Sequence, residues 1–359
     1  MLAIPRAAVA VSASHKTASA AKNTVAKMCN SIFQWAGQFE FYASRYKEPQ
    51  FKVTIIYFSR KVQSENAILS RTMPSTISIV GAGRLGRTLA RRLRELDWKI
   101  GPVVARSQAS ARTAVRAIGA GHPHAGVSSR VLHSSIILIA TPDTAIHEVA
   151  SKLARIGGEE WRGKVVLHTS GALDERELSP LAKLGASTGS MHPLQTFTGR
   201  AFTPLDGVVF AIQGDSRAQR AARRIARAVG GFPVSLRTGA KPAYHAAGTF
   251  ASPYLLAIIE CAIRILMRSG FSRRRAKMAL VPLIRQTLGN FERFGAHEAW
   301  TGAIARGDFA TVARHEKALA TWPSEVRDAY AALSRLSARL LAARPEKTLR
   351  ELDKILRPH

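Results

Sequence analysis

The spacing of hydrophobic positions divides the chain into two parts. Between residues 76 and 236, short apolar runs of strand length alternate with stretches of helical periodicity. The runs lie at 76–80, 101–107, 135–143, 164–172, 186–193, 207–214 and 232–236, and the Gly/His/Ser-rich stretch 119–134 leaves room for one weak further strand. Strands that alternate with helices predict a mostly parallel, doubly wound sheet. We therefore expect an α/β fold that begins with a Rossmann-like domain.

From about residue 238 the pattern changes to that of an all-α domain. Helical spacing of apolar residues covers 243–267, 272–288, 308–320, 323–343 and 346–356. The first of these stretches is apolar almost all round, which predicts a helix buried at a domain or subunit interface. We expect it to join two copies of the chain into a homodimer. We do not expect a membrane span, because the charge-free part, 246–259, ends at Glu260 and is shorter than the about 20 residues that a span requires.

These patterns predict four segments: 1–72, 73–237, 238–345 and 346–359. The last is a C-terminal helix or tail. Residues 1–72 lack clear periodicity apart from the apolar patch VTIIYF at 53–58. Met73 stands just before the first strand of the α/β domain, which favours Met73 as the true start and 1–72 as a disordered or spuriously translated extension. A targeting segment is the alternative, because the first 39 residues contain no acid and many Ala and Ser.

A glycine-rich loop joins the first strand to the first helix in TISIVGAGRLGRTLARRL, residues 76–93. Gly81, Gly83 and Gly86 have the G-x-G-x-x-G spacing of a dinucleotide site, and the strand–helix context gives that spacing its meaning. The glycines allow a tight turn, close approach of the backbone to a pyrophosphate, and close helix packing, while the helix N-terminus faces the phosphates. The residues predicted to hold the cofactor here are Gly81, Ala82, Gly83, Arg84, Leu85 and Gly86.

The end of the second strand indicates which dinucleotide binds. NAD-binding proteins usually place an acid about 20 residues past the glycine loop. Here Arg106 and Ser107 occupy that place, and no acid occurs between Asp97 and Asp143. A guanidinium and a hydroxyl suit a 2′-phosphate, so we expect the cofactor to be NADP(H). The alternative for Arg106 is one more exposed arginine in an arginine-rich protein.

Two further strand ends supply candidates for contact with the nicotinamide and for the chemistry. Thr141, Pro142 and Asp143 end the central strand, and Ser170 ends the next one, so all four belong at the same sheet edge. Asp143 is alternatively a helix cap.

The catalytic candidates are Lys241, His245 and His192. Lys241 and His245 are one helical turn apart and share a face, which suits a proton donor and its orienting partner. A core or capping role is the alternative for either histidine, and for His168 we expect packing. Residues near 301–315 could close over a substrate, with helix capping as the alternative for Asp308. No residues have metal-ligand spacing, so we expect no metal site.

Composition refines this interpretation in two ways. There are two cysteines and no C-x-x-C pair, which suits a reducing compartment, and we expect the cytoplasm. The formal net charge of +29 comes from 53 Lys and Arg against 24 acids. Because the basic residues are spread over many predicted helices, we expect a solvated arginine-rich surface rather than a nucleic-acid site.

Several sequence stretches are similar to known families. The glycine loop with IATPD (139–143) resembles the superfamily of pyrroline-5-carboxylate reductases, 3-hydroxyacid dehydrogenases and F420-dependent NADP reductases. The more specific stretches resemble a family of Rossmann-like NADP oxidoreductases with a C-terminal helical domain of unknown function (DUF2520 type). They are HTSGAL (168–173), MHPLQTF (191–197), KPAYHAAGTFAS (241–252) and WTGAIARGDFATVARHEKAL (300–319).

The resemblance extends from about Ser75 to residue 345. It implies NADP(H)-dependent hydride transfer to or from a small carbonyl or imine compound, with a lysine near the start of the long helix as proton donor. The chain departs from the family pattern at Pro253, where Asn is usual, and at Trp300 and Ala303. The departure at Pro253 keeps a second hypothesis open, a protein that binds or senses NADP(H) without turnover.

Overall fold

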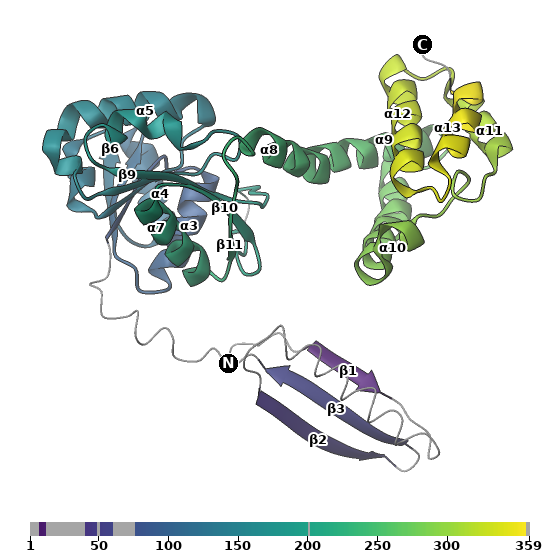
Figure 1. Ribbon diagram of the computed structural model, residues 1–359, viewed down its shortest axis with the longest axis horizontal. Helices are drawn as coiled ribbons and strands as arrows, with labels where there is room; N and C mark the ends of the chain where they lie inside the picture. The colour runs from purple at the N-terminus through teal and green to yellow at the C-terminus, as the bar shows by residue number, and fades with distance from the viewer. Residues whose placement is uncertain (1–6, 12–39, 49–50, 60–75, 200–201, 357–359) are drawn as a thin grey trace. The chain divides into compact units, whose positions relative to one another are not determined.

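The computed structural model describes residues 7–11, 40–48, 51–59, 76–199 and 202–356, which form two compact units, Met1–Ser75 and Thr76–His359 (Figure 1). The first unit contains an antiparallel sheet with the strand order β1 (Ala7–Val11), β3 (Phe51–Ser59) and β2 (Glu40–Glu48). The apolar patch 53–58 lies within β3. Most of the expected extension 1–72 lies outside the described residues, so its nature stays a prediction.

The second unit begins with an eight-stranded sheet in the order β11-β10-β9-β8-β7-β4-β5-β6. Neighbouring strands run parallel except for the antiparallel pair β9 and β10. This confirms the mostly parallel α/β fold, including the weak strand predicted within 119–134. The strands are β4 (Ile77–Val80), β5 (Ile100–Ala105), β6 (His122–Ala125), β7 (Ile136–Ile139), β8 (Val165–His168), β9 (Ser187–Pro193), β10 (Val209–Gly214) and β11 (Phe232–Ser235).

Helices cover both faces of this sheet (Figure 1). On one face lie α3 (Arg84–Arg94), α4 (Gln108–Ile118) and α7 (Ser216–Ala228), whose apolar sides share a core with strand residues such as Ile79 and Phe210. On the other face lie α5 (Asp143–Gly157) and the short α6 (Ser179–Ala182), around a second core that contains Trp161. Because both faces are covered, every residue of β4, β7 and β8 is buried, which explains their unbroken apolar runs.

The strand order places the candidate site. The chain runs outward from β4 through β5 to β6, then returns to β7 on the other side of β4. Where the strand order reverses in this way, the loops at the carboxyl ends of the strands leave in opposite directions and form a crevice for a ligand. The loops that follow β4, β5, β7 and β8 all lie at this edge of the sheet.

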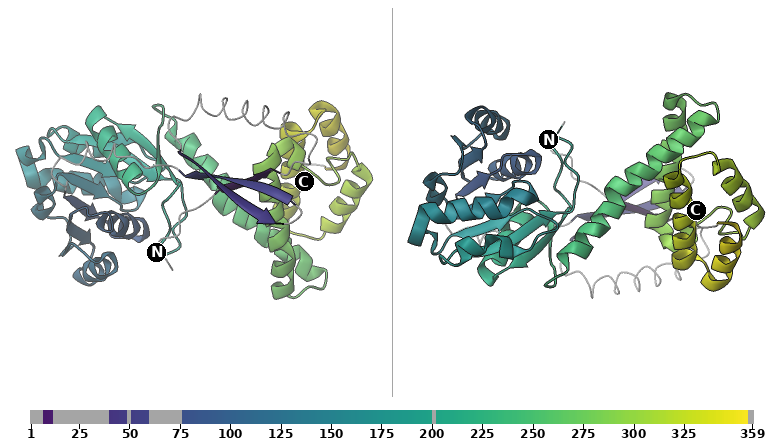
Figure 2. Two further views of the ribbon diagram at one scale, coloured as in Figure 1. Left: turned by 90° about the horizontal axis from the view of Figure 1, so that it is seen from below. Right: turned by 90° about the horizontal axis from the view of Figure 1, so that it is seen from above.

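The C-terminal part is helical. Helix α8 (Lys241–Thr249), a π-helical turn (Phe250–Tyr254) and α9 (Leu255–Arg268) form one continuous rod (Figures 1 and 2). It is followed by α10 (Arg273–Ala299), α11 (Phe309–Leu319), α12 (Ser324–Leu341) and α13 (Pro345–Ile355). A small core that includes Val312, Ala338 and Leu352 holds the last three helices together. The predicted helices of this domain are therefore all present.

The rod carries its apolar residues on its surface. Leu256 is 65% exposed and Phe250 is 61% exposed, so the helix predicted to be buried is not buried within one chain. Its burial stays a prediction about a second subunit. Among the described residues, Lys241–Arg268 is also the one helix long and apolar enough to cross a membrane, a criterion of length and composition alone.

Candidate dinucleotide and catalytic site

The glycine loop forms a tight cradle at the end of β4. Gly81 has a φ of 94°, and a Cβ there would lie 2.7 Å from the backbone of Ala140 and Thr141. A Cβ on Gly86 would lie 2.5 Å from the carbonyl oxygen of Gly81. Both positions thus exclude a side chain, one through its turn and one through helix packing. The backbone of the loop is thereby pressed against the end of β7.

Gly83 differs, because a Cβ there would meet nothing within 4 Å. It precedes α3, whose N-terminus has no side-chain cap and no acid in its first turn. Among the described residues no side chain caps the first amides of α3, and the Cβ position of Gly83 beside them is open. Open space next to uncapped helix amides fits a phosphate group.

The other predicted loop residues have different surroundings. Ala82 and Leu85 are half-buried against the core. Arg84 is exposed, and its Nη1 donates a hydrogen bond to the carbonyl oxygen of Phe197 at 3.4 Å. This contact aligns Arg84 with the 197–199 segment beside the cradle.

Arg106 and Ser107 lie just beyond the end of β5, and both are exposed. Ser107 caps α4, since its Oγ accepts a hydrogen bond from the amide of Ser110 at 3.2 Å. The guanidinium of Arg106 has no hydrogen-bond or ion-pair partner in the part of the chain that the structure describes. This segment thus presents a cation and a capped helix N-terminus, and residues 98–142 contain no Asp or Glu.

Thr141 stands at the end of β7, opposite the glycine loop. Its Oγ1 is buried and has no hydrogen-bond partner among the described residues. A buried hydroxyl without a partner costs free energy unless a ligand or water satisfies it. Together with the space at Gly83, this hydroxyl at the switch point fits a bound dinucleotide.

Three predicted residues meet at the ends of β7 and β8. Ser170 Oγ donates a hydrogen bond to Asp143 Oδ2 at 2.8 Å, and Lys241 Nζ donates to the carbonyl oxygen of Ser170 at 2.5 Å. Asp143 is the first residue of α5, which follows Pro142, and its hydrogen bond here goes to Ser170 rather than to a helix amide. Ser170 Oγ also accepts from the amides of Ala172 and Leu173, so its side chain holds the turn that presents its carbonyl to Lys241.

Lys241 is buried to 1% exposure. Burial lowers its pKa to about 8, although the carboxylate of Asp143 opposes that shift. An ammonium has three N–H donors, and among the described residues the Ser170 carbonyl is the one acceptor of Nζ. Two donors therefore remain for a ligand. The amine is thus cationic at neutral pH, with a pKa close enough to neutrality for proton transfer.

His168 is fully buried behind this turn. Its Nδ1 accepts a hydrogen bond from the amide of Ser170 at 3.2 Å, so its Nε2 carries the proton and donates to the carbonyl oxygen of Asp174 at 2.9 Å. Burial, followed by the cation of Lys241, lowers the pKa of His168 to about 4. His168 therefore supports the turn as a neutral group, in agreement with the packing role expected for it.

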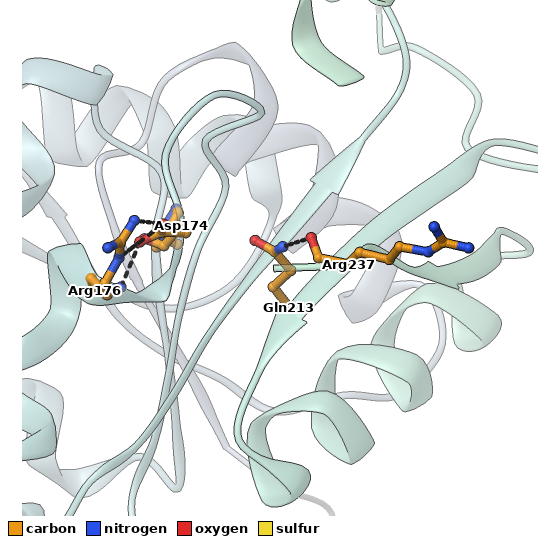
Figure 3. Close-up of polar contacts among 5 residues, drawn as sticks. Asp174, Arg176, Gln213 and Arg237 are labelled. Atoms are coloured by element: carbon orange, nitrogen blue, oxygen red, sulfur yellow. Dashed lines mark hydrogen bonds and ion pairs between the residues drawn. The ribbon is translucent and has the colours of Figure 1, made fainter. Parts of the chain in front are cut away.

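Two side-chain contacts hold the segments around the site (Figure 3). Arg176 donates to Asp174 at 2.6 Å, which closes the loop after β8. Gln213 Nε2 donates to the carbonyl oxygen of Arg237 at 2.7 Å and so anchors the chain between β11 and α8. The second contact ties Arg237, which precedes α8 in the chain, to β10.

His192 and His245 reach the same place from different elements. His192 lies near the end of β9 and His245 on α8, and their ring centroids are 6.3 Å apart. A Cβ on Gly171 would lie within 2.9 Å of atoms of both rings. The structure therefore brings all three catalytic candidates, Lys241, His192 and His245, to the carboxyl end of β8.

Sequence reasoning did not select Tyr244 or Gly171. Tyr244 OH and His192 Nδ1 are 2.8 Å apart. Tyr244 lies three residues after Lys241, a spacing that places both on one helix face, so helical periodicity could have identified it. Gly171 could not be identified in this way, because its role depends on two rings from distant segments.

The candidates near residues 301–315 are not brought to this group. Asp308 caps α11 by accepting from the amide of Thr311 at 3.0 Å, as its alternative interpretation predicted. His315 Nδ1 pairs with Tyr330 OH at 3.0 Å. Within the described residues, no cluster of three or more His, Cys, Asp or Glu side chains is arranged to hold a metal ion.

The architecture defines a Rossmann-like nucleotide-binding fold with an appended helical domain. Two family models match the chain: a Rossmann-like domain over residues 63–193 and a domain of unknown function, DUF2520, over residues 208–337. The chain thus carries a Rossmann-like domain followed by a DUF2520 domain, as its motifs predicted. No curated protein matches the sequence.

Solved structures with the same fold are covered over nearly their whole length. A Bacteroides fragilis protein named as a “putative NADP oxidoreductase” is 20% identical, with 73% of this chain and 97% of that one covered and a TM-score of 0.60. A Thermotoga maritima protein is 24% identical, with 77% and 98% covered and a TM-score of 0.56. A reductive aminase from Aspergillus terreus, in complex with NADPH and ethyl-5-oxohexanoate, is 18% identical, with 79% and 93% covered and a TM-score of 0.50.

Proposed function

We propose that this protein is an NADP(H)-dependent oxidoreductase that transfers a hydride to or from a small carbonyl or imine compound. The observation that carries the proposal is the convergence of two groups at one sheet edge. The glycine cradle and the unpartnered Thr141 hydroxyl lie at the ends of β4 and β7, and buried Lys241 lies at the end of the adjacent β8. The NADPH-bound relative with this fold supports the same conclusion.

The cofactor would be held by the cradle and by the loop after β5. Residues 81–86 and the first amides of α3 would bind its pyrophosphate, and Arg106 and Ser107 its 2′-phosphate. Its nicotinamide end would be lined by Thr141, Pro142 and Asp143, and Ser170 would hold Asp143 in place through their hydrogen bond. When bound, the nicotinamide supplies or accepts the hydride.

The protein's own chemistry in this proposal is proton transfer. Reduction of C=O or C=N requires a proton on the heteroatom, and Lys241 is the cation placed to give it. The Ser170 carbonyl fixes Nζ, and Asp143 fixes Ser170. His192 and His245 form the wall beside it. Burial of Lys241 lowers its pKa, so it is both a stronger acid than a free lysine and still protonated at neutral pH.

Comparison of NADPH and NADH affinity tests the cofactor assignment. Wild-type protein should bind NADPH more tightly in a fluorescence titration. Arg106→Asp should lower NADPH affinity by roughly ten- to a hundredfold, the range for a lost charge-assisted hydrogen bond with added repulsion, and should leave NADH affinity unchanged. Arg220→Asp on the exposed side of α7 is the matched control. Equal NADPH and NADH affinities in the wild type would reject the assignment.

A homodimer through the C-terminal helices is part of the proposal. The exposed apolar residues of the rod continue onto α10, where Met278, Leu283 and Phe291 are each more than half exposed. An apolar groove of about 980 Å³ also runs between α9 and the start of α12, with Cys261 and Trp322 in its wall. So large a set of exposed apolar side chains is typical of an interface. A second copy covers them without a membrane, and a cytoplasmic location stays a prediction.

Pro253 favours a second candidate function, NADP(H) binding without turnover. This proline lies in the π-helical turn between α8 and α9, because it has no amide hydrogen to continue the α-helical pattern. The turn follows Lys241 and His245 on the same rod. A screen of carbonyl and imine compounds that monitors NADPH consumption separates the two functions, with Lys241→Ala as the inactive reference.

A further inference from the structure

The proposed reaction makes no use of one of the shortest side-chain contacts in the site. His192 Nδ1 and Tyr244 OH are 2.8 Å apart, and the two rings meet edge to face with centroids 5.6 Å apart. His192 belongs to β9 and Tyr244 to the first turns of α8. The contact therefore joins the sheet to the helix that carries Lys241.

The direction of this hydrogen bond follows from what each group can donate. Burial, followed by the cation of Lys241, lowers the pKa of His192 to about 4, although the carboxylate of Asp143 opposes the shift, so the ring is neutral and has one N–H. Burial raises the pKa of Tyr244 to about 12, so its phenol keeps its proton. In the described part of the chain, His192 is the one side chain or backbone group within hydrogen-bond reach of the phenol.

Two arrangements are possible for this pair. If Tyr244 donates to Nδ1, the phenol proton and the Nδ1 lone pair are both satisfied and the ring proton is on Nε2. If Nδ1 donates instead, two groups have no partner among the described residues, the phenol proton and the Nε2 lone pair. The first arrangement leaves one such group, the Nε2–H, and is therefore the more stable.

We propose that Tyr244 is a positioning residue that holds His192 in its Nε2–H tautomer, so that Nε2 donates to an oxygen of the substrate. This inference rests on the proposed function. Nε2 lies 2.9 Å from the place where a Cβ of Gly171 would be, directly over the backbone that follows Ser170. Lys241 Nζ binds the carbonyl of Ser170. Two donors, one cationic and one neutral, thus act at the same peptide segment.

This pair of donors selects a chemical class of substrate. A neutral N–H and an ammonium both require an acceptor, and they suit a compound whose carbonyl or carboxylate oxygen lies at or beside the reacting carbon. A protonated His192 would satisfy the same geometry, but it would bring a second cation next to Lys241. The neutral tautomer gives directional hydrogen bonding without that repulsion.

The nitrogen NMR signals of the imidazole ring report the tautomer directly, without cofactor or substrate. In protein labelled with ¹⁵N-histidine, we expect His192 of the wild type to carry its proton on Nε2. Tyr244→Phe should convert His192 to a mixture of tautomers or to the Nδ1–H form. The matched control is Tyr330→Phe, which removes the partner of the second His–Tyr pair and should change His315 alone. His192→Gln identifies the signals.

A wild-type Nδ1–H ring, or a tautomer that Tyr244→Phe leaves unchanged, would overturn the proposal. NADPH titration of the same samples keeps the two questions apart. Tyr244→Phe should bind NADPH like the wild type, whereas failure of the wild type to bind NADPH contradicts the proposed function and leaves the tautomer result standing. Once a substrate is identified, Tyr244→Phe should lower kcat/KM about tenfold, mainly by raising KM. This is the effect expected when the hydrogen bond from His192 Nε2 to the substrate is lost.

Discussion

At the scale of single residues, the three glycines of the loop have different physical roles. Gly81 and Gly86 are required by the fold, because a side chain at either would collide with backbone. Gly83 is required by nothing in the described protein, since its φ of −72° suits any residue and a Cβ there would meet open space. A glycine that the fold does not need is best explained by a ligand that approaches the backbone closely.

This difference predicts opposite phenotypes for two alanine variants. Gly83→Ala should leave the melting temperature near that of the wild type and lower NADPH affinity at least tenfold, because its methyl group occupies the space assigned to the pyrophosphate. Gly81→Ala should destabilise the protein by roughly 1–3 kcal/mol, because it combines a left-handed φ with overpacking. Thermal unfolding and NADPH titration measure the two effects. A Gly83→Ala protein with normal NADPH affinity would argue against the cradle.

Lys241 gives a pH-dependent prediction. Its pKa of about 8 means that the donating, protonated form is present below that pH and is lost as the pH rises through it. The kcat/KM for reduction should therefore fall above about pH 8. Lys241→Met should lower kcat by roughly 10²–10⁴, the usual contribution of a general acid, and should remove this limb of the profile. Lys183→Met changes an exposed lysine and is the control. If kcat/KM of Lys241→Met still falls above about pH 8, another group is responsible for the fall.

At the scale of elements, the most informative feature is the rod formed by α8 and α9. One end is anchored to the sheet through Lys241 and Tyr244, while the rest exposes apolar side chains. A helix that is apolar all round is stable in water only when something covers it. We therefore propose that the anchored end serves the candidate site and that the exposed remainder binds a second copy of the chain.

An acidic substitution on the rod tests that division of roles. Leu256→Asp should convert a dimer to a monomer, because Leu256 is 65% exposed in one chain and would be desolvated between two. Size-exclusion chromatography with light scattering gives the mass of each variant. Ile156→Asp is the matched control, since this apolar residue is 40% exposed on the Rossmann-like domain. A wild-type protein that is monomeric at micromolar concentration would contradict the dimer.

At the scale of the whole molecule, buried histidine couples stability to pH. The pKa of His168 is about 4 in the folded protein, against 6.5 for a histidine free of such surroundings, as in an unfolded chain. Between these values the unfolded chain binds the proton more strongly, so unfolding becomes easier as the pH falls. His168 alone should cost about 3 kcal/mol of stability between pH 6.5 and pH 4. His192 acts in the same direction, because its pKa is lowered as well.

Urea unfolding of the wild type and His168→Asn at about pH 7 and about pH 4.5 measures this contribution. The variant should be less stable than the wild type at the higher pH, because the turn at Ser170 loses a partner, and it should lose less stability on acidification. His122→Asn, at an exposed histidine, should behave like the wild type at both values. The same pH dependence in His168→Asn and in the wild type would show that other groups control acid unfolding.

The fold prediction is confirmed, whereas the roles of the site residues stay predictions. Strands such as β7 are short apolar runs, and the C-terminal helices are long apolar or periodic stretches punctuated by glycine, so local patterns identified them. Lys241 and His245 were paired because they share a helix face, and only the structure shows that His192 lies beside them. Tyr244 was missed because a tyrosine in an apolar helix is usually a packing residue. Only the structure shows that its hydroxyl contacts His192.

The sequence by itself determined the alternation of strand and helix, the glycine loop, the absence of an acid between Asp97 and Asp143, and the change to an all-α domain at about residue 238. All of these depend on residues close to one another along the chain. Only the tertiary structure decided that the 243–267 helix is exposed within one chain, that Thr141 Oγ1 lacks a partner among the described residues, and that Gly83 borders open space. Those facts depend on the distances between segments far apart in sequence, which packing alone sets.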